Sequence, residues 1–63
     1  MAYRIREIRK EQHLSQKELS KLSGVSRATI SGLESGKIIV TTTETLRKLA
    51  AALGKEPGEI FLS

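Results

Sequence analysis

The stretch Ser15–Gly36 constrains the fold more than any other part of the chain, because it carries start and stop signals for two short helices. Ser15 followed three residues later by Glu18 is a capping box, in which both side chains bond backbone N–H groups at a helix start. A helix is therefore expected to begin at Gln16. Gly24 is the residue best able to adopt the left-handed conformation that ends a helix and turns the chain.

The apolar residues of this stretch fall at helical spacing. Leu19 and Leu22 lie three apart in the first helix, and Ile30 and Leu33 lie three apart in the second. Val25 is expected to plug the turn between them. Two short helices joined by a tight turn are thus predicted, an arrangement that many small bundles also contain.

A second helix is expected over residues 26–35. Ser26 can cap it by accepting a hydrogen bond from a backbone N–H, and Gly36 can end it. The residue types of the whole unit are more specific than its spacing. Those that carry the signal are Gln16, Gly24, Val25, Ile30, Leu33, Glu34, Ser35 and Gly36.

Together these residues resemble the helix-turn-helix of the Cro and phage-repressor (XRE-type) family of DNA-binding domains. The resemblance covers residues 3–61 of the chain. It implies an all-α fold, a compact five-helix bundle of the lambda-repressor-like DNA-binding type. Helices 2 and 3 would form the helix-turn-helix, at about residues 16–35.

Length and composition fit one small domain over residues 1–63. A chain of this size buries only about 60% of its unfolded surface, and with 3% aromatic residues and no Trp its core must consist of Leu, Ile, Val and Ala. The chain has no Cys and one His, so no metal site and no cofactor are expected. The sequence shows no evident pairing of a nucleophile with a general base, so we expect that the protein is not an enzyme.

Charge favours a polyanionic partner. Eleven Lys and Arg residues against seven acids give a net charge of +4 and a pI near 9.9, which suits DNA but also occurs on surfaces that bind nothing. The run at residues 9–11 is typical of a solvated helix face. The charged residues 3–7 do not resemble a signal peptide, and no apolar run reaches membrane length, so a cytoplasmic protein without membrane contact is expected.

Two further helices flank the central unit. The first is expected over Ala2–Gln12, with Ile5 and Ile8 facing the core. His13 stands where the family often has glycine, and His tolerates a positive φ, so we interpret His13 as a strained helix end and not as a ligand.

The fourth helix is expected to begin at Thr41, paired with Glu44 as a capping box, or with Thr42 as the cap. Gly54 should end it, and Pro57 suits the first position of a last short helix. The apolar stripe of the fourth helix comprises Leu46, Leu49, Ala50 and Leu53.

The chain departs from the family at two places. Relatives usually have a basic loop with a proline where residues 37–43 stand here, which puts phosphate contacts from this loop in doubt. Ser20 replaces the usual alanine where the two motif helices cross. Its hydroxyl is expected to bond back to a carbonyl of the preceding turn.

The resemblance also implies an ion pair. By register, Arg9 falls where the family places an arginine that pairs with the glutamate ending the recognition helix, here Glu34. A partly buried bidentate pair would fix the first helix against the third. The alternative is a free surface arginine.

The outer face of the helix at residues 26–35 is expected to lie in the DNA major groove. Arginine can fork onto guanine O6 and N7, and an alanine methyl can meet a thymine methyl. A glycine in the middle of a helix, such as Gly32, costs about 1 kcal/mol of stability relative to alanine. A face that only meets solvent would have no need of a glycine there. The alternative is that these small residues merely face solvent. The base contacts expected are Arg27, Ala28, Ser31 and Gly32.

A backbone phosphate contact is expected at the start of the helix that begins at Gln16, where free N–H groups and the helix dipole favour anions. The family uses the glutamine at the position of Gln16 on a phosphate, a contact that positions the protein without specifying sequence. The other candidates are Lys17, Ser26, Thr29, Ser35 and Lys37.

The predicted function is sequence-specific binding of a double-stranded DNA operator by a homodimer, as a transcriptional regulator and by preference a repressor. Alternatives are an antitoxin with a toxin partner, a restriction-modification controller, and a protein-interaction module that has lost DNA binding. A two-fold dimer needs surface that the fold leaves uncovered. The expected dimer contacts are Ile39, Val40, Phe61 and Leu62.

Overall fold

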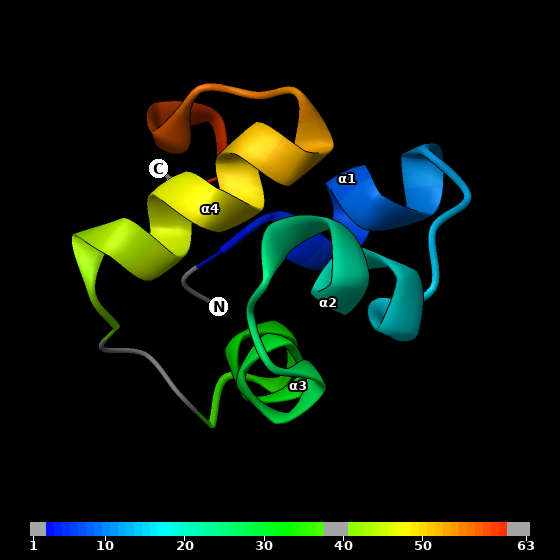
Figure 1. Cartoon of the computed structure of the whole chain (residues 1–63), viewed down its shortest axis with the longest axis horizontal. Helices are drawn as coiled ribbons and strands as arrows, with labels where there is room; N and C mark the ends of the chain where they lie inside the picture. The colour runs from blue at the N-terminus through cyan, green and yellow to red at the C-terminus, as the bar shows by residue number, and fades with distance from the viewer. Residues whose placement is uncertain (1–2, 38–40, 61–63) are drawn as a thin grey trace.

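A computed structural model describes residues 3–37 and 41–60, which form four α-helices followed by one 3₁₀ helix (Figure 1). The elements are α1 (Ile5–Glu11), α2 (Gln16–Ser23), α3 (Arg27–Ser35), α4 (Thr43–Leu53) and η1 (Pro57–Ile60). The all-α prediction is confirmed for these residues. The predicted fifth α-helix is not, because the segment that begins at Pro57 forms a 3₁₀ helix.

The capping box that starts α2 is present as predicted. The Glu18 backbone N–H donates to Ser15 Oγ at 3.0 Å, and the Ser15 backbone N–H donates to Glu18 Oε1 at 2.9 Å. At the other end of α2, Gly24 adopts the left-handed conformation with φ of 74°. Both ends of this helix are therefore set by residues within one turn of it.

The ends of the other helices follow similar local rules. Ser26 and Thr42 cap α3 and α4, each accepting a hydrogen bond from the backbone N–H three residues on. Of the two residues expected as the cap of α4, Thr41 and Thr42, the structure therefore shows Thr42. His13 has φ of 58°, the only positive value at a described residue other than glycine, as expected for a helix end without glycine.

Helix α1 begins later than predicted, at Ile5 and not at Ala2. The Arg4 backbone N–H donates to the Ile60 carbonyl at 2.7 Å, so the chain just before α1 lies against the end of η1 (Figure 1). No side chain caps the start of α1. The backbone just before Ile5 is therefore bonded to η1 and is not part of α1.

One apolar cluster holds the described elements together. The expected inward residues of α1, α3 and α4 are buried, and so is Val25 in the turn. Leu22 is an exception, since 62% of its surface is exposed, and its predicted place on the inward stripe is wrong. The buried apolar residues are Tyr3, Ile5, Ile8, Leu19, Val25, Ile30, Leu33, Leu46, Leu49, Ala50, Leu53 and Ile60.

Two polar side chains bridge elements of this core. Ser20 Oγ donates to the Val25 carbonyl at 2.6 Å, so it bonds forward to the turn and not back to the preceding turn as predicted. Gln12 Nε2 donates to the Leu53 carbonyl at 2.7 Å and satisfies a carbonyl at the end of α4. In the described ranges, no helix is long and apolar enough to cross a membrane.

Candidate nucleic-acid interface

The two faces of α3 differ in the way that the sequence predicts. Ile30 and Leu33 are buried against the other helices, whereas Arg27, Ala28 and Ser31 are exposed. Ser26 caps the helix, so Arg27 and Ala28 occupy its first turn. The exposed side therefore presents one long cationic side chain among small ones, a surface that can approach a groove closely.

Gly32 does not lie on this exposed face. The sequence pattern placed it opposite Ile30 and Leu33, but the structure buries it. Helical periodicity gives the direction in which a position points but not which neighbouring segments cover it, and the small surface of a glycine is easily covered. The predicted outward position of Gly32 is wrong.

Arg9 and Glu34 form the predicted ion pair, with bidentate geometry. Arg9 Nε donates to Glu34 Oε2 at 2.8 Å, and Arg9 Nη2 donates to Glu34 Oε1 at 3.0 Å. Arg9 Nη1 also donates to the Leu14 carbonyl at 2.8 Å. Both residues are 9% exposed. The pair joins α1 to α3 and fixes the guanidinium in one orientation.

Gln16 extends this pair into a three-helix network. It lies half-buried at the first position of α2, and its Nε2 donates to Glu34 Oε1 at 3.1 Å. Because an amide nitrogen carries two protons, one of its donors is engaged and the other is left for a ligand. The glutamine expected to hold a phosphate is thus oriented by the carboxylate at the end of α3.

The charge state of Glu34 follows from these contacts. Burial alone would raise the pKa of the carboxyl group. Hydrogen bonds from Arg9 and Gln16, together with the positive charges of Arg9 and Arg6, outweigh burial and hold the pKa of Glu34 below its ordinary value. Glu34 is therefore a carboxylate at neutral pH and keeps its partners oriented.

A hollow of about 210 Å³ opens beside this network. It unites the ion pair with three residues expected to contact DNA, namely Gln16, Ser31 and Ser35. It also brings in two cationic residues of α1 that the site prediction omitted, although their four-residue spacing could have placed them on one helix face. The lining residues of this junction hollow are Arg6, Arg9, Lys10, Gln16, Ser31, Glu34 and Ser35.

The other expected phosphate contacts lie outside the junction hollow. Lys17 and Lys37 are exposed. Ser26 Oγ donates to Thr29 Oγ1 at 2.8 Å and accepts from the Thr29 backbone N–H, so these hydroxyls already bond each other at the start of α3. The expected dimer contacts Ile39, Val40, Phe61 and Leu62 lie outside the described residues.

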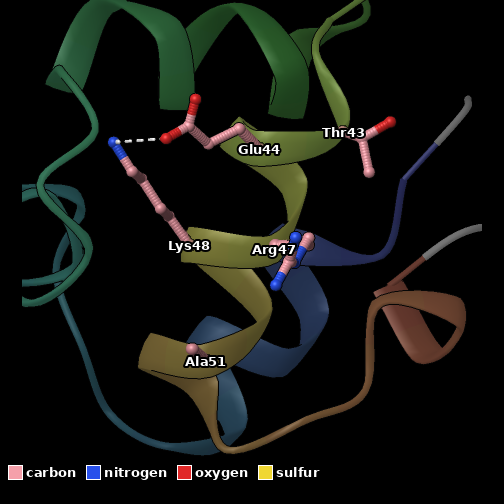
Figure 2. A pocket seen from close by; sticks show the side chains of 5 residues that line it. All are labelled: Thr43, Glu44, Arg47, Lys48 and Ala51. Atoms are coloured by element: carbon pink, nitrogen blue, oxygen red, sulfur yellow. Dashed lines mark ion pairs between the residues drawn. The ribbon is translucent and has the colours of Figure 1, made fainter.

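A larger hollow of about 580 Å³ lies on the outer face of α4. Figure 2 shows that all of its lining side chains project from this single helix, with Glu44 and Lys48 reaching toward each other. Lys48 Nζ lies 3.8 Å from Glu44 Oε1 in an exposed pair four residues apart. The residues that line this α4 hollow are Thr43, Glu44, Arg47, Lys48 and Ala51.

Comparisons with known proteins agree with this geometry. Among curated proteins, the chain is 38% identical over 55 residues to "Putative antitoxin HigA2" of Mycobacterium tuberculosis (strain ATCC 25618 / H37Rv), covering 87% of this chain and 54% of that protein. It is 42% identical over 59 residues to "Uncharacterized HTH-type transcriptional regulator RghRB" of Bacillus subtilis (strain 168), covering 94% of this chain and 42% of that protein. It is 41% identical over 46 residues to "ImmF control region 10 kDa protein" of Bacillus phage phi105, covering 73% of this chain and 50% of that protein.

The chain thus spans about half the length of these curated relatives. No solved structure matches it at the same level of significance. The family model described as "Helix-turn-helix" matches residues 5–60, which include every helix described above. The chain therefore belongs to the helix-turn-helix family of the Cro and phage-repressor (XRE) type.

Proposed function

We propose that this domain binds double-stranded DNA sequence-specifically as a homodimer, with α3 in the major groove, and represses transcription. The observation that carries the proposal is the divided surface of α3. Its apolar residues are buried, whereas Arg27, Ala28 and Ser31 form an exposed face next to a cationic junction. This role is one of binding and involves no catalysis.

Roles within the site divide by position. Arg27 is the one long donor on the exposed side of α3 within the described chain, so it is assigned to a base edge. Gln16 is oriented by Glu34 at the start of α2, where a free amide proton and the helix N-terminus suit a phosphate. The first residue specifies sequence, and the second positions the protein.

A homodimer follows from the geometry of operators that helix-turn-helix proteins recognise. Two half-sites one helical turn apart require two copies of α3 related by a two-fold axis. A regulator named in Bacillus subtilis and a phage control-region protein among the relatives support a regulatory role. Repression is the simplest form of regulation, because occupancy of the operator alone can block access to a promoter.

The proposal predicts how the native protein and Arg27→Ala behave in site selection. Selection from random duplexes should yield a two-fold symmetric sequence, and affinity should fall linearly with salt on a log-log plot. Arg27→Ala should then cost about 1–3 kcal/mol of binding and relax the preference at one position per half-site. Binding to the selected duplex and a repeated selection measure both effects.

Gln16→Ala is the matched control, because it removes a contact to the backbone and not to a base. It should weaken binding to all duplexes alike and leave the selected sequence unchanged. A salt-independent affinity would contradict DNA binding. A change of preferred base in Gln16→Ala would reverse the roles assigned to the two residues.

The similarity to a protein named as an antitoxin favours a second candidate function. In that case the domain would bind a toxin protein as well as its operator. Coexpression with the product of the adjacent gene provides the test. An antitoxin should relieve a growth arrest caused by that product and purify with it, whereas a simple repressor should do neither.

A further inference from the structure

We propose that the junction hollow holds one phosphate group of the DNA backbone, and that Arg6 and Lys10 of α1 are its cationic ligands. The inference rests on the proposed DNA binding and extends it to a helix outside the helix-turn-helix. Three cationic residues line the hollow together with a single carboxylate, that of Glu34. Two positive charges are therefore in excess.

The family register points to Arg9, but the cations of the hollow that are available to a ligand are Arg6 and Lys10. The Arg9 guanidinium uses three of its five N–H donors on Glu34 and the Leu14 carbonyl, and its charge is paired with the Glu34 carboxylate. Arg6 and Lys10 are exposed, and among the described residues neither has an ion-pair partner. Because residues four apart lie on one side of a helix, both can reach a ligand in the same hollow.

The remaining lining completes an anion site. Gln16 keeps one free amide proton, and Ser31 supplies an exposed hydroxyl group from α3. The hollow of about 210 Å³ is several times the roughly 30 Å³ that a water molecule occupies in the liquid, which leaves room for a tetrahedral phosphate group. Since Ser31 and Ser35 also line the hollow, a strand beside α3 would bring its backbone there.

The test compares two double variants that remove the same charge. Arg6→Ala with Lys10→Ala changes the junction hollow, and Arg47→Ala with Lys48→Ala changes the α4 hollow. Binding to a random duplex is measured by fluorescence anisotropy over a range of salt concentrations. The junction variant should bind roughly tenfold more weakly at low salt and lose about 0.9 from the salt slope per protomer, the value for one neutralised phosphate.

The α4 variant should keep the salt slope of the native protein. The variant that exchanges the two cations, Arg6→Lys with Lys10→Arg, keeps both charges and should also keep the native slope. Equal slopes in both alanine variants would overturn the inference while leaving DNA binding intact. Absence of duplex binding by the native protein would overturn both. Saturable binding of inorganic phosphate alone below a millimolar concentration would assign the hollow to a free anion and overturn the backbone assignment.

Discussion

The junction hollow and the α4 hollow differ in how they are built. The junction hollow is lined by three helices and contains a bidentate ion pair between residues that are 9% exposed. The α4 hollow is almost three times larger, but one helix supplies its lining, and its ion pair spans 3.8 Å between side chains that are 52% and 78% exposed. Size therefore does not indicate which surface is organised for a ligand.

The difference shows what tertiary structure adds to a charged surface. Glu44 and Lys48 are neighbours because of helical spacing, and any solvated helix with this pair would have the same contact (Figure 2). Arg9 and Glu34 are 25 residues apart and meet only when α1 and α3 have packed. The second kind of pair can fix the orientation of a binding surface, whereas the first cannot.

The largest effect that distinguishes these surfaces should come from Glu34→Ala. Removing one partner of a buried pair strands the other charge, which typically costs 3–5 kcal/mol. Since the junction hollow is open to water, we expect a loss of about 3 kcal/mol in the free energy of unfolding. Denaturant melts measure it, and a loss of only a few tenths would show that Arg9 is effectively solvated.

Acid should have an intermediate effect, through the same carboxylate. The pKa of Glu34 is lower in the folded protein than in the unfolded chain, so its stabilisation is fully present above the unfolded pKa, which is about 4.5. It is lost as the pH falls through the folded value. Thermal melts from pH 6 to pH 2 should therefore show a steeper loss of stability in the native protein than in Glu34→Gln.

Some acid sensitivity should persist in that variant. Hydrogen bonds from the backbone and side chain of Ser15 lower the pKa of Glu18, which remains in place. A profile for Glu34→Gln that overlays the native one would mean that the junction carboxylate has no part in acid unfolding. The charge network of the junction would then differ little from the exposed pair on α4.

The smallest effect should come from Lys48→Ala. An exposed pair four residues apart contributes about 0.3–0.5 kcal/mol, which added salt screens further. We therefore expect denaturant melts of this variant to differ from the native protein by less than about 0.5 kcal/mol. A loss above about 1 kcal/mol would mean that the α4 surface is more organised than its geometry indicates.

The sequence was most informative where a structural outcome depends on neighbours within one helical turn. The Ser15 and Glu18 capping box, the left-handed Gly24 and the strained His13 are all present as predicted. Each depends on hydrogen bonds or steric limits between residues at most five apart. The Arg9 and Glu34 pair is long-range, and it was found through family register and not through local rules.

Predictions failed where burial depends on how distant segments pack. Leu22 has the spacing of an inward residue but lies on the surface, and Gly32 has the spacing of an outward residue but is buried. Arg6 and Lys10 were overlooked because nothing local distinguishes them from other charged residues on a helix. Only the approach of α1 to α2 and α3 places them beside the proposed DNA contacts.

The hydrogen bond from the Arg4 amide to the Ile60 carbonyl has a consequence for how the domain opens. It joins the two ends of the described chain and so closes the largest loop in it (Figure 1). Closing such a loop costs conformational entropy, and this cost is offset only when the intervening helices have packed. Arg4 is therefore held against η1 while the helices between them stay packed, and we expect hydrogen exchange at the Arg4 amide to quicken when that packing is weakened.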